Sequence, residues 1–190
     1  VLSSGVNASS EQADGSTAYG NDKAFRGDPV AAYFQNSLKK MGGLAMAQQK
    51  ALGQTDHLAR KCAVCHGEDG TSSAPMKKVV VPNIAAQQPL YLFRQLWNLR
   101  SGERNHPVMA VMAEGTSDDD LLALSLRFSA LPLPPSQGMA IGGHSARGKD
   151  IYNELCIHCH GEDGMGISGI PRLKGQNPTY LVNTLTSFRD

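Results

Sequence analysis

A nine-residue phrase occurs twice in this chain, as CAVCHGEDG at 62–70 and as CIHCHGEDG at 156–164, and the two copies use all four cysteines. Two disulfides are one interpretation, but a gap of two residues within each pair strains a structural bridge. Zinc is another, although it leaves the histidine after each second cysteine without a role. A thioredoxin-like dithiol requires a preceding strand, and none is predicted before either copy. The phrase therefore indicates a chemistry that also uses the histidine.

The C-x-x-C-H spacing is typical of covalent attachment of c-type haem. The thiols expected to form thioethers to the haem vinyl groups are Cys62, Cys65, Cys156 and Cys159. The imidazoles of His66 and His160 are the expected proximal ligands of the iron. The spacing places both sulfurs and the imidazole on one side of a short helical stretch. The sequence therefore predicts two covalently bound haem c groups.

A second repetition follows each motif, because the segment 82–101 aligns with the segment 171–190. The identical pairs are Pro82/Pro171, Gln87/Gln176, Pro89/Pro178, Tyr91/Tyr180, Leu92/Leu181, Leu96/Leu185 and Arg100/Arg189. The cysteine motifs lie 94 residues apart and these segments 89 residues apart, so the loop after the first motif is five residues longer. The chain is therefore a tandem duplication.

Each repeat is predicted to contain a helix, the haem motif, a loop and a further helix, which makes the expected fold all-α with two small helical bundles in tandem. The expected segments are an N-terminal arm at 1–40, a first haem domain at 41–131, a linker at 132–144 and a second haem domain at 145–190. Helical propensity also extends over 28–52. Its apolar stripe is expected to pack into a core and consists of Tyr33, Phe34, Leu38, Met41 and Leu44.

Two helices have clear boundary signals. The segment 89–101 begins with a proline at a favourable first position and ends before Gly102, and its apolar stripe comprises Leu92, Leu96 and Leu99. Ser117 with Asp120 three residues later resembles a capping box for a helix that starts there. The helices that lead into the two motifs are predicted at 41–61 and 145–156.

A haem with one histidine ligand has a second axial position to fill. Thioether sulfur there favours ferrous iron and raises the potential, whereas a second imidazole lowers it. The segment NHPVMAVMAEG offers Met109 and Met112, and His106 is the bis-histidine alternative. We predict Met109 as the sixth ligand of the first haem.

Three groups of residues carry a resemblance to the di-haem class I cytochromes c, especially the cytochrome c4 family. They are the two CxxCHGEDG phrases, the pair AQQPLYL and GQNPTYL, and MAVMAEGTSDDDLLALSLRFSAL. The resemblance covers about 50–190 and implies two class I cytochrome c domains, each with a methionine ligand just before its last helix. In that family the ligand lies eight residues before the serine of the capping phrase, which implies Met109 from Ser117.

The second repeat departs from this pattern. By the repeat spacing, its methionine would lie near position 198, past Asp190, and the closing helix is missing from the sequence as well. We therefore expect the protein to continue beyond this residue, because an uncovered haem would expose a large apolar face. Otherwise the second haem takes Met139, His144 or Met165 as its sixth ligand, or stays open.

The resemblance implies a non-enzymatic carrier of single electrons between a quinol-oxidising complex or dehydrogenase and a terminal oxidase or reductase. One alternative is a cytochrome subunit of a larger dehydrogenase or oxidase complex. Another is a di-haem peroxidase, if the second haem is open. A thiosulfate dehydrogenase with a cysteine axial ligand is excluded, because no cysteine remains after two haems. We predict no catalytic residue.

Composition and the chemistry of haem attachment limit the possible partners and the cellular location. A formal net charge of +1 gives no case for nucleic acid as a partner, and no apolar run approaches the roughly 18–20 residues that span a bilayer. The chain starts at Val1 without a methionine, so we expect a removed signal peptide and a periplasmic location, soluble or peripherally attached to the membrane. Lys77 and Lys78 are candidates for docking redox partners.

Overall fold

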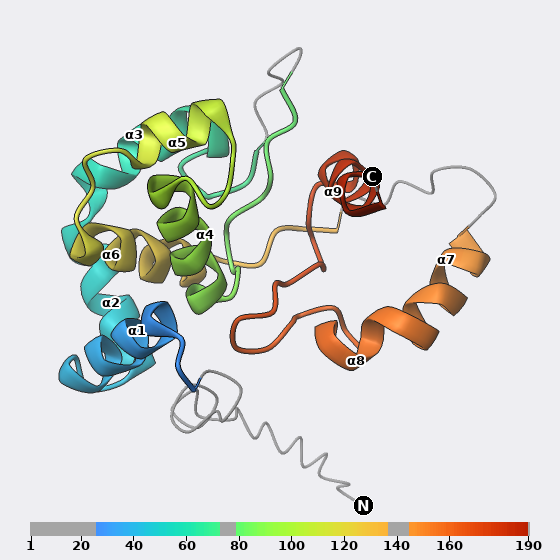
Figure 1. The fold of residues 1–190 in the computed structure, drawn as a ribbon, viewed down its shortest axis with the longest axis horizontal. Coiled ribbons are helices and arrows are strands. Elements are labelled where there is room, and N and C mark those ends of the chain that lie inside the picture. Colours follow the sequence, from blue (N-terminus) through green and yellow to red (C-terminus); the bar gives the residue numbers. More distant parts are fainter. Residues whose placement is uncertain (1–25, 73–78, 137–144, 190) are drawn as a thin grey trace, which may run out of the picture.

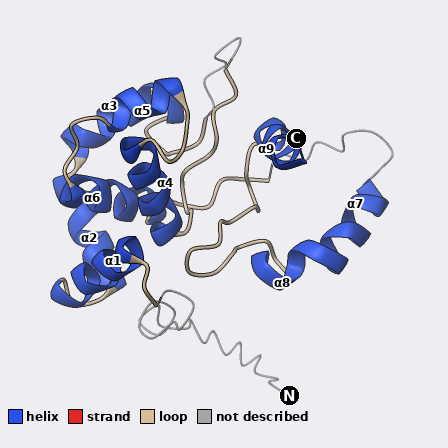
Figure 2. Cartoon of the chain, viewed as in Figure 1, coloured by secondary structure: helices blue, strands red, loops and turns tan. Residues whose placement is uncertain are grey.

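The computed structural model describes residues 26–72, 79–136 and 145–189, and over these ranges every regular element is a helix (Figure 2). The first half contains α1 (Pro29–Lys40), α2 (Leu44–Gln54), α3 (Asp56–His66), α4 (Pro89–Ser101), α5 (Pro107–Ala113) and α6 (Asp118–Ser129). The second half contains α7 (Ser145–Ile151), a π-helical turn (Tyr152–Cys156), α8 (Ile157–His160) and α9 (Pro178–Arg189). The all-α fold predicted from the sequence is confirmed.

The core of the first half forms where α4 and α6 pack against each other, with α2 against α6 and α1 against α4 (Figure 1). The buried side chains of this cluster are Ala31, Phe34, Leu38, Ala47, Ala51, Leu90, Phe93, Leu121, Leu122 and Leu126. A smaller cluster joins α3 to the other face of α4 and α6 through Ala59, Leu92, Leu124 and Phe128. The helix that carries the first CxxCH motif is therefore fixed to the same bundle.

The helical propensity of 28–52 is expressed as two helices. Gly42 and Gly43 have φ angles of +83° and +101°, which break the chain between α1 and α2. The predicted stripe nevertheless packs into the core, because Phe34 and Leu38 are buried there and Tyr33 contacts the cluster. α1, which the sequence assigned to the N-terminal arm, thus shares its core with the first half. Similarly, the helix predicted at 41–61 is divided at Thr55 into α2 and α3.

Both boundaries predicted for α4 are confirmed. Pro89 is the first residue of the helix, and Gly102 ends it in the left-handed conformation at a φ of +82°. Its apolar stripe faces the bundle, with Leu92 and Leu99 buried and Leu96 partly buried.

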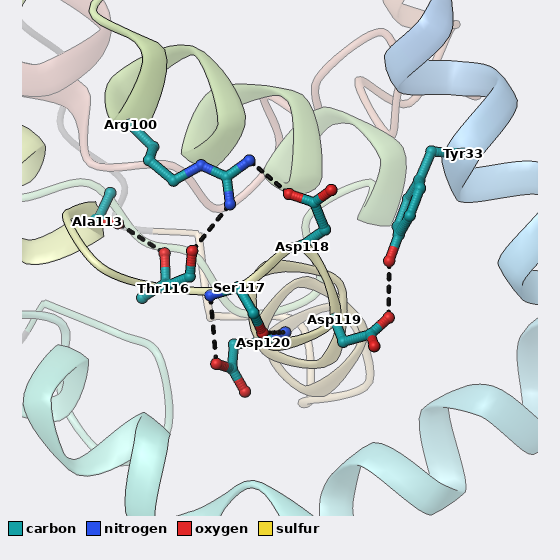
Figure 3. Close-up of polar contacts among 8 residues, drawn as sticks. All are labelled: Tyr33, Arg100, Ala113, Thr116, Ser117, Asp118, Asp119 and Asp120. Atoms are coloured by element: carbon teal, nitrogen blue, oxygen red, sulfur yellow. Dashed lines mark hydrogen bonds and ion pairs between the residues drawn. The ribbon is translucent and has the colours of Figure 1, made fainter.

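The capping box at the start of α6 is present as predicted. The Ser117 hydroxyl accepts from the Asp120 backbone N–H at 3.1 Å, and an Asp120 carboxylate oxygen accepts from the Ser117 backbone N–H at 3.3 Å (Figure 3). Arg100 of α4 binds this end of α6 through Asp118 at 2.5 Å and through the Thr116 carbonyl at 2.8 Å. The acidic residues thus hold α6 to α4 as well as capping it.

Replacing Ser117 with alanine is expected to lower the free energy of unfolding of the first half by about 1 kcal/mol, the usual effect of losing a serine N-cap. Trp97, the single tryptophan of the chain, lies in α4 and reports on this half by its fluorescence during urea unfolding. Ser136, exposed and outside any helix, provides the matched S136A control. Equal midpoints for S117A and S136A would contradict the capping role.

The second half has little core of its own among the described residues. Neither α7, α8 nor α9 contributes a buried residue. Large apolar side chains are exposed instead, among them Leu155, Leu185 and Phe188. Within the described ranges, no helix is both long and apolar enough to cross a bilayer.

The two halves are joined by two reciprocal sets of hydrogen bonds between buried residues. Gln176 accepts from the Asn83 backbone N–H at 2.7 Å and donates to the Asn83 carbonyl at 2.9 Å. In the matching set, Gln87 accepts from the Arg172 backbone N–H at 2.6 Å and donates to the Arg172 carbonyl at 3.1 Å. The glutamines are repeat equivalents, as are Asn83 and Arg172, so a pseudo-two-fold axis relates the two sets.

Candidate haem sites

The first CxxCH motif ends α3. Cys62, Cys65 and His66 lie at positions i, i+3 and i+4, which share one face of a helix. His66 is 6% exposed, and its Nδ1 lies 2.9 Å from the Pro82 carbonyl oxygen. That contact requires the proton on Nδ1, which leaves the Nε2 lone pair available to a metal. Burial lowers the pKa of His66 against the opposing effect of this hydrogen bond, so the neutral ring is favoured.

A cavity of about 230 Å³ adjoins this motif and is walled largely by apolar side chains. Its apolar walls come from the 79–84 loop, from α4, α5 and α6, and from the second half, and include Val81, Ile84, Leu92, Leu96, Leu99, Val108, Leu124, Phe128, Leu173 and Leu181. Cys62, Cys65 and His66 line the same cavity. An apolar space beside two thiols and a free imidazole lone pair fits a covalently held tetrapyrrole.

The three candidate sixth ligands of the first site differ in whether their side chains line the cavity. Met109 of α5 lines the cavity together with His66. Met112, three residues later, is 38% exposed and is not among the residues that line it. His106 also lines the cavity, but its Nδ1 accepts from the Met109 backbone N–H at 3.3 Å and so caps α5. Met109 is thus the candidate whose side chain lines the cavity and makes no capping hydrogen bond.

The second motif has the same local design in a more open setting. His160 places its Nδ1 2.8 Å from the Pro171 carbonyl oxygen, as His66 does with the repeat-equivalent Pro82. His160 and Cys156 are half-buried and Cys159 is exposed. The helix that leads into this motif differs from the first by a π-helical turn at Tyr152–Cys156. The motif therefore orients its histidine in the same way, while its second cysteine and its histidine are more exposed than those of the first motif.

The loop after each motif is fixed by an equivalent glycine. The Gly70 carbonyl accepts from Ile84 and Ala85, at 2.8 and 3.1 Å, and the Gly164 carbonyl accepts from the backbone N–H groups of residues 173 and 174, at 2.7 and 3.1 Å. Both glycines have a φ of +70°, and a Cβ on Gly70 would lie 2.9 Å from the Ala85 nitrogen. These contacts hold the loop whose proline carbonyl orients the imidazole.

The sixth ligand of the second site stays a prediction. The Met165 backbone carbonyl accepts from Gln88 at 2.9 Å, which ties its loop to the first half. Met139 and His144 lie outside the described residues, as do Lys77 and Lys78. His57 and His158 are exposed.

The four cysteines are free and belong to no metal-binding cluster among the described residues. None of the four cysteines forms a disulfide. Among the described residues, no three His, Cys, Asp or Glu side chains gather into a metal-binding cluster, so the two pairs do not form one four-sulfur zinc site.

Residues of the second half also line the first cavity, and the sequence analysis did not identify them. Arg172, Gln176 and Tyr180 reach it across the interface. Tyr91 lies near Tyr180, its repeat equivalent, and burial chiefly, with a smaller contribution from that neighbour, raises the pKa of Tyr91 to about 12. The repeat alignment marked both tyrosines as equivalent, but nothing in the sequence shows that the two copies meet.

The helical fold and the CxxCH-flanked cavity define a class I cytochrome c. Residues 145–190 match the family model for cytochrome c. The chain is 34% identical over 159 residues to cytochrome c4 of Pseudomonas aeruginosa, covering 78% of this chain and 75% of that one. It is 31% identical to a thiosulfate dehydrogenase electron acceptor of Stutzerimonas stutzeri, covering 77% and 74% of the two chains.

The solved structure of Acidithiobacillus ferrooxidans cytochrome c4 matches with a TM-score of 0.58 at 31% identity, covering 68% of this chain and 81% of that one. The chain therefore belongs to the cytochrome c4 family. The resemblance and the class I cytochrome c fold expected from the motifs are confirmed. The protein is an electron-transfer cytochrome whose cofactor is covalently bound haem c.

Proposed function

We propose that the protein carries single electrons through two haem c groups, one in each half. Thioethers form at Cys62 and Cys65 in the first site and at Cys156 and Cys159 in the second. His66 and His160 are the proximal ligands. The observation that carries the proposal is the Nδ1 contact to a proline carbonyl at 2.9 and 2.8 Å, repeated at both motifs, which leaves Nε2 of each ring for iron.

Haem supplies the one-electron chemistry of the iron, and the chain supplies attachment, orientation and a low-polarity surround. Pro82 and Pro171 fix the histidine rings. Met109 serves as the sixth ligand of the first site, where its thioether favours the ferrous state. Leu92, Leu99 and the other apolar walls keep water from the first haem. The sixth ligand of the second site is not assigned.

The domain boundaries are part of the proposal. The first haem domain comprises 41–131 and the second comprises 145–190, with a linker at 132–144. Of the N-terminal arm at 1–40, α1 packs onto the first domain through Phe34 and Leu38.

The proposed partners are a donor, either a quinol-oxidising complex or a dehydrogenase, and an acceptor, either a terminal oxidase or a reductase. The name of the Stutzerimonas stutzeri relative, a thiosulfate dehydrogenase electron acceptor, supports a dehydrogenase as donor. Docking between such carriers is transient and partly electrostatic, so its rate should fall with rising ionic strength. We propose the periplasm as the location, since thioether attachment of haem belongs to exported proteins.

The first test is the intact mass of the purified protein together with its reduced and oxidised optical spectra. The proposal requires an intact mass that exceeds the mass of the same polypeptide without haem by two haems, and full reversible reduction of both. The variants C62A/C65A and C156A/C159A are matched, and each should retain one haem. A protein with a single haem, or one that retains two haems in either double variant, would contradict the site assignment. Rapid carbon monoxide binding with peroxide turnover would contradict the carrier role.

A further inference from the structure

The short helix α5 carries Met109, the proposed sixth ligand of the first haem, and few of its side chains are anchored in the protein. Of its seven residues Ala113 is the buried one, whereas Val108 and Val111 are 58% and 67% exposed. A helix of this length is marginal in water without outside support, because few of its hydrogen bonds close within it. The position of Met109 therefore depends on the contacts at the ends of α5.

The C-terminal end of α5 is held by its connection to α6 and α4. The Thr116 hydroxyl donates to the Ala113 carbonyl at 2.6 Å, and Arg100 of α4 donates to the Thr116 carbonyl at 2.8 Å (Figure 3). These contacts act on the last turn of α5 rather than on the turn that contains Met109.

The first turn of α5 receives two hydrogen bonds from His106, its N-cap residue. The Ala110 backbone N–H donates to the His106 carbonyl at 2.9 Å. The Met109 backbone N–H donates to the imidazole Nδ1 of His106 at 3.3 Å. Pro107, the first residue of the helix, has no N–H to contribute. The side chain of His106 thus holds the ligand residue itself, and its main chain holds the next one.

His106 and His66 line the same cavity, but their hydrogen bonds select opposite tautomers. His66 donates its Nδ1 proton to the Pro82 carbonyl and keeps a lone pair on Nε2. His106 accepts at Nδ1, so its proton lies on Nε2, and that nitrogen has no lone pair for iron. The hydrogen bond to Met109 therefore also disfavours His106 as a competing ligand.

We infer that His106 is a positioning residue for the sixth ligand, because its Nδ1 fixes the Met109 backbone and so keeps the Met109 side chain at the first cavity. The inference rests on the proposed haem in that cavity and on Met109 as its ligand. Without this hydrogen bond the first turn of α5 frays more often. A methionine that leaves the cavity more often competes less well with another ligand for the iron.

The test compares H106V with H106T, two side chains of nearly the same shape, of which threonine offers an N-cap acceptor and valine offers none. Imidazole is titrated into the ferric protein, and the near-infrared methionine-to-iron band that M109A removes is followed. We expect the imidazole concentration that halves this band to fall roughly fivefold in H106V, the usual effect of losing an N-cap. In H106T it should stay within about twofold of the wild-type value.

The matched control is S117A, because Ser117 caps the neighbouring helix α6 and makes no hydrogen bond to Met109. Urea unfolding followed by Trp97 fluorescence measures stability in every variant. S117A should unfold at a lower urea concentration, yet it should need as much imidazole as the wild type. Equal imidazole concentrations for H106V and H106T, or the same fall in S117A, would mean that His106 does not position the ligand.

Further variants keep the outcomes distinct. If H106V does not accumulate with haem, H106A replaces it, since alanine also lacks an acceptor. Loss of the first haem from both, with haem retained in H106T, supports the inference, whereas loss from all three overturns it. A band that survives in M109A rejects the ligand assignment in the proposed function. A band that M109A removes, with no difference between H106V and H106T, rejects the role of His106 alone.

Discussion

Replacing Met109 with alanine is expected to abolish the weak near-infrared methionine-to-iron band of one haem and to lower its reduction potential on the order of 100 mV. The choice of axial ligands changes haem reduction potentials over a range of about 0.8 V. Removing a thioether that favours ferrous iron should therefore have a large effect. The side chain lines the cavity beside His66 and is not needed for any described hydrogen bond.

The matched control is M112A, since Met112 lies on the same short helix but is 38% exposed. It should leave the band and both potentials at their wild-type values. A third variant, H106A, tests the bis-histidine alternative, and it should retain the band. Loss of the band in M112A, or its survival in M109A, would show that the ligand assignment is wrong.

Replacing Phe93 with alanine is expected to lower the free energy of unfolding by about 3–5 kcal/mol, which is a large part of the stability of a small domain. Phe93 is fully buried in α4 and its ring lies 5.7 Å from Tyr33, 5.8 Å from Phe34 and 5.7 Å from Trp97, measured between ring centroids. The substitution removes both buried area and the centre of this aromatic cluster.

Phe188 provides the matched control, because it is 80% exposed on α9 and F188A should change stability by about 0.5 kcal/mol or less. Trp97 fluorescence during urea unfolding reports on the first half, and haem absorbance reports on both. Equal midpoints for F93A and F188A would mean that α1 does not pack onto α4 in solution.

The features that the sequence predicted correctly were those set by local chemistry. The limits of α4 follow from Pro89 and Gly102, and the start of α6 follows from the Ser117 and Asp120 pair. The repeat alignment paired the two motif histidines and paired Pro82 with Pro171, although it did not show that each proline carbonyl contacts its histidine. These features need no knowledge of which surfaces meet.

The features that the sequence did not predict depend on contacts between distant residues. Two glycines broke a segment whose propensity was helical, and burial of Phe34 joined α1 to the first bundle. The burial of Arg172 was hidden for the same reason, since its hydrogen-bond partners at residues 85 and 86 belong to the other half. A repeat shows that two copies are alike without showing that they face each other.

The reciprocal glutamine contacts have an evolutionary consequence. Each half presents the same patch to the other, which is the geometry of a symmetric homodimer. In a homodimer any change at one position occurs twice, so an arginine in place of Asn83 would bring two like charges to the axis. Fusing the copies in one polypeptide removes that constraint. It keeps the self-complementary surface while letting one copy carry Arg172 and the other carry the neutral Asn83 at the equivalent position.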